Sequence, residues 1–479
     1  MTEKSLLRFS TAGSVDDGKS TLIGRLLYDS NGAYDDQVEA VRKSKVNRSG
    51  GDFDFSLLTD GLRAEREQGI TIDVAWRYFA TPKRKFIIAD TPGHEQYTRN
   101  MATGASTVDL AIILIDARKG VVEQTRRHAY VSSLLGIRHL VVAVNKMDLV
   151  GFDESVFNRV RDDFDGLVEH LRRTSVRFIP LSALEGDNVT FRSPRTPWYG
   201  GPSLLEHLEE IDVDHALDQA PFRFPVQYVI RPDLDFRGFA GQIASGHVRP
   251  GDEVLVLPSG RRTRVARIVT MDGDLAEAHA PMSVTITLED EIDLGRGGIL
   301  AAAAAPPQTG RWLESSLVWM SPQKLVPGKP YILRHGPHQV TARVDRLVHR
   351  TEINTFACED SDHLELNQIG SAIIETTQPL HFDAYSENRR TGAFILIDPI
   401  SNLTLAAGMI ERPAADPHDA VRARKQLTFD SYRRALIVAD PDSPLPHALR
   451  EAGADVLLFD ARGRHHHEVL AELRSEGLL

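Results

Sequence analysis

The stretch from Gly13 to Ser20 constrains the fold of this chain more than any other feature of its sequence. It reads Gly-Ser-Val-Asp-Asp-Gly-Lys-Ser, which is the glycine and lysine spacing of a phosphate-binding loop. A strand-like run from Leu6 to Thr11 precedes it, and a helix-like run from Thr21 to Leu27 follows it. Backbone N–H groups of such a loop converge on phosphate, and the positive end of the next helix adds to the attraction. The stretch therefore predicts a nucleotide-binding domain.

Each residue of the loop has an expected task. Lys19 is expected to reach the outer phosphates and to support catalysis, and the Ser20 hydroxyl to bind Mg2+. Glycine permits the backbone turns that bring several N–H groups to one anion. The residues of this stretch expected to contact the nucleotide are Gly13, Ser14, Val15, Asp16, Asp17, Gly18, Lys19, Ser20 and Thr21.

Length and composition bound the class of protein. A chain of 479 residues is too long for one ordinary core, so several domains are expected. The net charge of -11 argues against a nucleic-acid-coating protein, and the apolar runs are too short to span a bilayer. We expect a cytoplasmic protein with no nucleic-acid or membrane partner. The lone cysteine, Cys358, excludes an intrachain disulfide and is expected to be a small buried hydrophobe rather than a reactive thiol.

The first part of the chain alternates short apolar runs with longer amphipathic ones. This pattern predicts a mostly parallel sheet covered by helices, with ligands at the carboxyl ends of the strands. The expected strands are Phe86–Ala89, Leu110–Ile115, Leu140–Val144 and Val176–Leu181. The expected helices include Glu123–Leu135 and Ser203–Glu210, the latter with Ser203 as its N-cap.

A charged segment from Gly61 to Ile72 precedes the next strand. Such a charge run is by default a solvated surface loop. Thr71 favours a second interpretation, because a hydroxyl on a mobile loop can ligate Mg2+ while its backbone contacts the terminal phosphate. We therefore expect Thr71 to bind the metal and to contribute to catalysis.

Asp90 to His94 follow the expected strand Phe86–Ala89 directly. Asp90 stands where a carboxylate holds Mg2+, usually through water. Gly93 lets its backbone N–H approach the terminal phosphate closely. His94 is then placed to orient the attacking water, which makes it the expected catalytic residue. The nucleotide contacts expected here are Asp90, Thr91, Pro92, Gly93 and His94.

The base is expected to bind after the strands Leu140–Val144 and Val176–Leu181. Guanine offers two adjacent N–H donors that one carboxylate can accept together, whereas adenine does not. Asp148 is expected to make that contact. Asn145 is expected to bridge loops, and the stem of Lys146 to lie along the ring of the base. Met147, which stands between Lys146 and Asp148 in the sequence, is also expected to contact the nucleotide. Ser182, Ala183 and Leu184 are expected to supply backbone N–H groups near the guanine oxygen.

These motifs make the first part of the chain resemble the GTPase domain of the translation-factor family. Three blocks carry a narrower resemblance to the GTP-binding large subunits of bacterial heterodimeric sulfate adenylyltransferases: Gly13 to Thr21, Asp60 to Asp73, and Arg390 to Asp398. Elongation factors generally carry His where this chain has Ser14. The resemblance covers roughly residues 5 to 412 and implies two β-barrels after the GTPase domain.

Strand-like runs and turns after the first domain agree with the two barrels. The expected strands of the first barrel are Pro225–Ile230, Gln242–Val248, Glu253–Leu257 and Thr263–Val269, and those of the second are Tyr331–Arg334, Gln339–Val348, Leu364–Ile374 and Ala393–Ile397. A low-complexity junction, Ala301 to Gly310, is expected between them. Arg389, Arg390 and Thr391 are expected in a loop before a strand, with a partner surface as the alternative.

The sequence thus predicts a P-loop GTPase domain over residues 1–215, antiparallel barrels over 220–308 and 311–412, and a small α/β appendage over 413–479. Two strand-like runs, Ala435–Ala439 and Ala454–Phe459, and helices Pro446–Ala452 and His466–Arg474 are expected in the appendage. No second phosphate loop follows residue 412, so no kinase activity is expected there.

The resemblance implies a GTPase that uses GTP and Mg2+, forms a heterodimer with a catalytic small subunit, and drives the synthesis of adenylylsulfate and pyrophosphate from ATP and sulfate. The alternative is an elongation factor that delivers aminoacyl-tRNA to the ribosome. An autonomous ATPase is disfavoured by Asn145 and Asp148.

Overall fold

The structure is a computed structural model that describes residues 5–30, 39, 53–58, 74–92, 98–172, 174–213, 217, 219–233, 235–416, 434–438 and 455–459. The chain forms two compact units, Met1–Ala414 and Ala415–Leu479. In the part of the chain described, no helix is long and apolar enough to cross a membrane.

The first unit begins with a six-stranded sheet in the order β2-β3-β1-β4-β5-β6. All neighbouring pairs are parallel except β2 and β3. The mostly parallel sheet predicted from the sequence is therefore confirmed. Its strands are β1 (Leu6–Ala12), β2 (Ala75–Ala80), β3 (Lys85–Asp90), β4 (Leu110–Asp116), β5 (His139–Asn145) and β6 (Ser175–Pro180).

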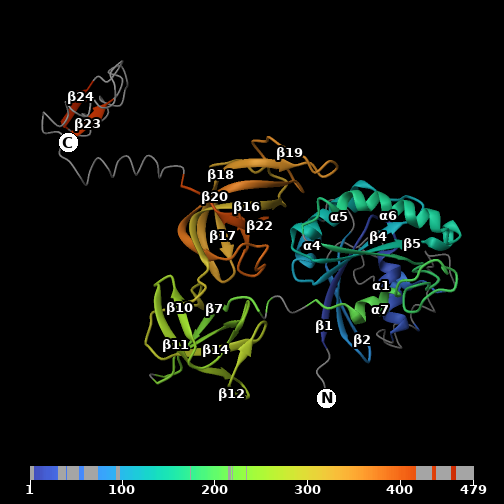
Figure 1. Ribbon diagram of the computed structural model, residues 1–479, viewed down its shortest axis with the longest axis horizontal. Coiled ribbons are helices and arrows are strands. Elements are labelled where there is room, and N and C mark those ends of the chain that lie inside the picture. Colours follow the sequence, from blue (N-terminus) through green and yellow to red (C-terminus); the bar gives the residue numbers. More distant parts are fainter. Residues whose placement is uncertain are drawn as a thin grey trace, which may run out of the picture. The chain divides into compact units, whose positions relative to one another are not determined.

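Helices cover both faces of this sheet (Figure 1). One apolar core contains Leu22 and Leu204 from the helices on one face, and another contains Met101, Val131 and Phe164 from those on the other. Burial on both faces explains why the central strands are apolar throughout. The helices are α1 (Lys19–Asp29), α4 (Thr98–Ala105), α5 (Glu123–Leu134), α6 (Glu154–Val168) and α7 (Leu204–Glu210), with the 3-10 turns η1 (Phe55–Leu58) and η3 (Met147–Val150).

Helix α7 begins as the sequence predicts. The Glu206 N–H donates to Ser203 Oγ at 3.3 Å, and the Ser203 N–H donates to Glu206 Oε2 at 2.8 Å. This reciprocal capping satisfies two N–H groups that the first helical turn leaves unpaired.

A closed six-stranded antiparallel barrel follows, in the order β10-β15-β7-β8-β14-β11, and β10 pairs with β11 to complete the ring. The expected strand Gln242–Val248 is wrong, because Gly246 is left-handed (φ 72°) and separates β8 from β9. The strands of this region are β7 (Arg223–Ile230), β8 (Gly238–Gln242), β9 (His247–Val248), β10 (Glu253–Leu257), β11 (Arg261–Thr270), β12 (Gly273–Leu275), β13 (Ala278–His279), β14 (Ser283–Leu288) and β15 (Ile299–Ala302).

The second barrel closes in the same way, in the order β17-β21-β22-β16-β20-β18, with β17 paired to β18. The expected strand Leu364–Ile374 begins later, at Ile369, and Cys358 is exposed rather than buried. The expected junction Ala301 to Gly310 is shorter, because β16 already begins at Gln308. The strands are β16 (Gln308–Trp319), β17 (Pro330–His335), β18 (His338–Thr351), β19 (Cys358–Glu359), β20 (Ile369–Phe382), β21 (Ala393–Ile397) and β22 (Thr404–Pro413).

The loop between β20 and β21 joins the parts of the first unit. Tyr385 donates its hydroxyl to the Leu135 carbonyl at 2.9 Å, and Arg389 Nη1 donates to the Val108 carbonyl at 3.1 Å. Arg390 donates to a carbonyl of the first barrel, and Thr391 is 2% exposed. The expectation of a loop before a strand is confirmed, and the side chains of Tyr385, Arg389 and Arg390 contact other parts of the first unit.

The second unit contains the parallel pair β23 (Arg434–Val438) and β24 (Asp455–Phe459). Both strands fall where the sequence predicts them. The expected helices Pro446–Ala452 and His466–Arg474 lie outside the described residues.

Candidate functional site

The phosphate loop lies between β1 and α1, at the carboxyl end of the central strand. Gly18 is left-handed, with φ 93°, and a Cβ there would lie 2.5 Å from Asn145 Nδ2. Glycine is therefore required both for the turn and for the close approach of Asn145 at the end of β5. Asp16 also has a positive φ, 68°, and Val15 beside it is an exposed apolar side chain.

Lys19 is folded against the loop that precedes it. Its Nζ donates to the Gly13 carbonyl at 2.9 Å and to the Ser14 carbonyl at 3.2 Å. Burial lowers the pKa of Lys19, while the nearby carboxylates of Asp90 and Asp17 oppose that shift. The ammonium of Lys19 is buried and bonded to neutral carbonyl oxygens, so a phosphate anion would be a stronger hydrogen-bond partner for it.

Asp17 fixes the shape of the loop from inside. Its side chain is buried, and Oδ2 accepts the Ser14 N–H at 2.7 Å. Burial raises the pKa of Asp17, and the hydrogen bond from Ser14 opposes that shift.

Two of the expected metal ligands, Ser20 and Asp90, are at the start of α1 and the end of β3. Asp90 ends β3 in register with Thr11, whose Oγ1 lies 3.5 Å from Asp90 Oδ1. Thr91 is anchored by its hydroxyl to the Thr11 carbonyl at 2.6 Å. The Ser20 hydroxyl, at the start of α1, and the Asp90 carboxylate are hard oxygen donors that fit Mg2+ when phosphate oxygens complete its shell. Pro92 is buried beside Thr91, whereas Thr71, Gly93 and His94 lie outside the described residues.

The expected base-binding residues meet the phosphate loop through Asn145. Its Nδ2 donates to the Asp17 carbonyl at 2.7 Å, and its Oδ1 accepts the Ala183 N–H at 2.9 Å. One amide thus joins the phosphate loop, the end of β5 and the loop after β6. Met147 is fully buried and Asp148 half-buried at the start of η3. Ser182 Oγ accepts the Glu185 N–H at 3.2 Å, and the Leu184 carbonyl accepts from Arg25.

Sequence reasoning missed Asp116 and Arg118. Asp116 ends β4, and its carboxylate lies 3.1 Å from Lys146 Nζ. No motif marks it, but a carboxylate directly after the buried strand beside β5 is a signal that was available in the sequence.

His128 on α5 is a second residue that the sequence did not single out. It is 3% exposed, and its Nδ1 has no hydrogen-bond partner within the described part of the chain. Burial lowers the pKa of His128 to about 3, and the charges of Lys19 and Arg127 add to the effect. The imidazole is therefore neutral at physiological pH.

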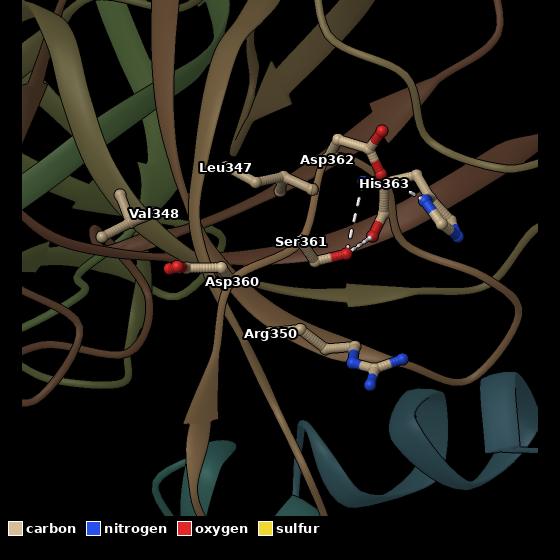
Figure 2. Close-up of a pocket in the computed structure, with 7 residues that line it drawn as sticks. All are labelled: Leu347, Val348, Arg350, Asp360, Ser361, Asp362 and His363. Atoms are coloured by element: carbon tan, nitrogen blue, oxygen red, sulfur yellow. Dashed lines mark hydrogen bonds and ion pairs between the residues drawn. The ribbon is translucent and has the colours of Figure 1, made fainter.

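A separate hollow of about 630 Å³ lies on the second barrel and contains none of these residues. Figure 2 shows Ser361, Asp362 and His363 gathered at one side of it. Its polar groups pair with neighbours: His363 Nδ1 lies 2.7 Å from Asp362 Oδ1, and Arg350 pairs with Glu359. We assign no chemistry to the hollow.

Comparison with known proteins first identifies the class of protein to which this chain belongs. Residues 4–219 match the family described as elongation factor Tu GTP binding domain, and residues 312–411 match the GTP-eEF1A C-terminal domain-like family. With the phosphate loop joined to an Asn-Lys-x-Asp strand end, this makes the chain a translation-factor-type GTPase.

More particular relatives cover most of the chain. Sulfate adenylyltransferase subunit 1 of Chromobacterium violaceum is 56% identical over 85% of this chain and 86% of its own length. The same subunit of Citrobacter koseri is 55% identical over 91% and 92%. The bifunctional enzyme NodQ of Rhizobium is 58% identical over 85% of this chain and 64% of its own length. The chain belongs to the sulfate adenylyltransferase subunit 1 family.

Proposed function

We propose that this chain is the GTP-hydrolysing subunit of a sulfate adenylyltransferase and couples GTP hydrolysis to the formation of adenylylsulfate and pyrophosphate from ATP and sulfate. The observation that carries the proposal is the Asn145 bridge, which unites the phosphate loop with the expected guanine-reading segment in one site. The family supplies the reaction to which that site belongs.

Each predicted residue has a task in this proposal. Lys19 holds the outer phosphates, while Ser20, Thr71 and Asp90 bind Mg2+ with the phosphates. Mg2+ bound by these residues would neutralise charge that develops on the phosphate oxygens. His94 orients the attacking water, which needs a hydrogen-bonding side chain more than a strong base.

Base selection lies at the other end of the site. Asp148 accepts the paired N–H donors of guanine, and the segment of Ser182, Ala183 and Leu184 contacts the guanine oxygen. In the structure the Ser182 N–H donates to the Asp187 carbonyl and the Ala183 N–H to Asn145 Oδ1. Asn145 keeps the two ends in register through its contacts to Asp17 and Ala183.

The partner is a separate small catalytic subunit that performs adenylyl transfer. The relatives are named as one subunit of an enzyme, which supports a two-chain assembly. Forming adenylylsulfate from ATP and sulfate is uphill, so coupling it to GTP hydrolysis has a thermodynamic purpose. The domains in this proposal span residues 1–215, 220–308, 311–412 and 413–479. The protein works in the cytoplasm. We expect no kinase activity from residues 413–479.

The deciding experiment measures pyrophosphate release from ATP and sulfate by the chain together with its small subunit, with and without GTP. Strong GTP dependence supports the coupled reaction. An active complex that ignores GTP overturns it. Co-purification of the chain with tRNA and stimulation of its GTPase by ribosomes would instead assign it to translation.

A further inference from the structure

A buried carboxylate outside the predicted motifs lies beside the base-binding segment. Asp116 is paired with Asn145 across β4 and β5, and the Ala117 N–H donates to the Asn145 carbonyl at 2.9 Å. The Asp116 side chain is 0% exposed. Burying a charge is unfavourable unless it is paired and hydrogen-bonded, so this position requires strong partners.

Arg118 and Lys146 supply those partners. Asp116 Oδ1 accepts from the Arg118 N–H and Nε, each at 3.0 Å, and Oδ2 accepts from Arg118 Nη2 at 2.6 Å. Lys146 Nζ lies 3.1 Å from the same Oδ2. Burial opposes ionisation of Asp116, but these donors outweigh it and hold the pKa of the carboxyl well below its ordinary value. The carboxylate is therefore charged at neutral pH and has its lone pairs satisfied.

Lys146 is the residue whose position this arrangement fixes. Its backbone is left-handed, with φ 62°, a conformation that is unfavourable for a residue with a Cβ. Its ammonium donates to the Asp16 carbonyl in the phosphate loop and also pairs with Asp116 on β4. Because these two anchors belong to different elements, the long stem of Lys146 keeps little rotational freedom.

Arg118 extends the arrangement toward Asp148. The Arg118 side chain is 48% exposed, and its Nε and Nη2 both donate to the Asp116 carboxylate. Hydrogen bonding to Asp116 raises the pKa of Arg118, and the charge of Asp148 adds to that effect. The carboxylate expected to read guanine thus has a fixed cation nearby.

We propose that Asp116 is a positioning residue for the guanine nucleotide: it holds Lys146 between β4 and the phosphate loop, and so sets how long the nucleotide stays bound. The inference rests on the proposed guanine-nucleotide function of the site. Asp116 itself is not expected to contact the nucleotide, but it orients Lys146, which is. Its effect falls equally on GTP and GDP, because the base and the phosphate loop are common to both.

The test uses the full-length chain loaded with fluorescent GDP or GTP analogues. Asp116→Asn replaces the charge that attracts Lys146, and a hydrogen bond to a charged group is worth roughly a tenfold to hundredfold change in an equilibrium constant. We expect nucleotide dissociation to accelerate by about tenfold or more for both nucleotides. We also expect the KM for GTP to rise while kcat at saturating GTP stays near the parental value.

A double-mutant cycle separates positioning from a general structural effect. If Asp116 acts through Lys146, Asp116→Asn will add little to the dissociation rate in a Lys146→Ala background. Additive effects in the cycle would overturn the proposal. Asp153→Ala is the control, because Asp153 caps α6 by accepting the Ser155 N–H at 2.7 Å and alanine has no acceptor there. It should lower the melting temperature and leave nucleotide dissociation unchanged.

Asp116→Glu keeps the experiment decisive if the asparagine variant does not fold. It retains the buried charge but displaces the carboxylate by one methylene, so nucleotide dissociation should again accelerate. A folded variant at position 116 with parental dissociation rates would overturn the role of Asp116. A parent chain that binds ADP as tightly as GDP would instead refute the proposed function, and that result is visible before any variant is made.

Discussion

The side-chain amide of Asn145 donates to the main-chain carbonyl of Asp17 at 2.7 Å, which ties the strand end expected to hold the base to the loop expected to hold phosphate. Asn145 is 1% exposed. Asn145→Ala removes this donor and leaves the Asp17 carbonyl without it, which costs about 1–3 kcal/mol. We expect GDP affinity to fall roughly tenfold to hundredfold in a fluorescence titration.

Asn188→Ala is the control for that measurement. Asn188 is equally buried and donates to the Pro180 carbonyl at 2.8 Å and to Thr196 at 2.9 Å. Its loss should lower the melting temperature but leave GDP affinity near the parental value. Equal losses of affinity in both variants would refute the bridging role of Asn145.

Asp148→Asn should move base preference from guanine toward xanthine. The amide replaces one acceptor of the expected carboxylate contact with a donor, and xanthine presents a carbonyl where guanine has its exocyclic amine. Competition of GDP and XDP for the bound fluorescent nucleotide measures the change, which we expect to exceed about tenfold in relative affinity. Unchanged selectivity would remove Asp148 from the base contact.

His94→Ala should separate nucleotide binding from turnover. Because the Asp-Thr-Pro-Gly-His order places His94 to orient water, GTP affinity should change little while single-turnover hydrolysis slows by about a hundredfold or more. Phosphate release from preloaded GTP measures the rate. A variant that hydrolyses GTP at the parental rate would show that another group orients the water.

The buried imidazole of His128 predicts a loss of stability in acid. Its pKa is lowered to about 3 in the folded chain from an ordinary 6.5. Between these values the unfolded state binds a proton that the folded state does not, so the free energy of unfolding falls as the pH drops. The contribution is at most about 1.4 kcal/mol per pH unit.

Hydrogen exchange of the β4 and β5 amides at pH 7, 6 and 5 tests this expectation. His128→Gln should flatten the part of the pH dependence that His128 causes. His247→Gln, at an exposed position on the first barrel, should leave it as in the parent. Identical pH profiles for the parent and His128→Gln would contradict the prediction.

The sheet and the loops at its carboxyl end were predictable because their signals are local. Apolar runs bounded by glycine or a capping residue place β1, β4 and β5, and Ser203 with Glu206 marks the start of α7. By contrast, β2 went unpredicted. Its outward residues Trp76 and Tyr78 are aromatic, so its sequence lacks the alternation of apolar and polar residues that marks a half-buried strand.

The missed site residues depend on register rather than on local sequence. Asp116 acquires a role only because β4 pairs with β5 and brings it beside Lys146. Likewise, Cys358 is exposed because β19 is a two-residue strand at the edge of its sheet, a tertiary fact that composition does not contain.

Tyr385 links the loop after β20 to the end of α5, and its loss should weaken that link without impairing the nucleotide site. The hydroxyl donates to the Leu135 carbonyl at 2.9 Å, and burial raises the pKa of Tyr385 to about 12. Tyr385→Phe leaves that carbonyl without this donor, which should destabilise the chain by about 1–3 kcal/mol. Differential scanning calorimetry measures the loss, while GDP affinity serves as the internal reference. Tyr331→Phe is the matched control, since Tyr331 is buried in the second barrel but its hydroxyl has no partner among the described residues. A melting temperature unchanged in Tyr385→Phe, or lowered equally in both variants, would show that the hydroxyl of Tyr385 does not hold the junction together.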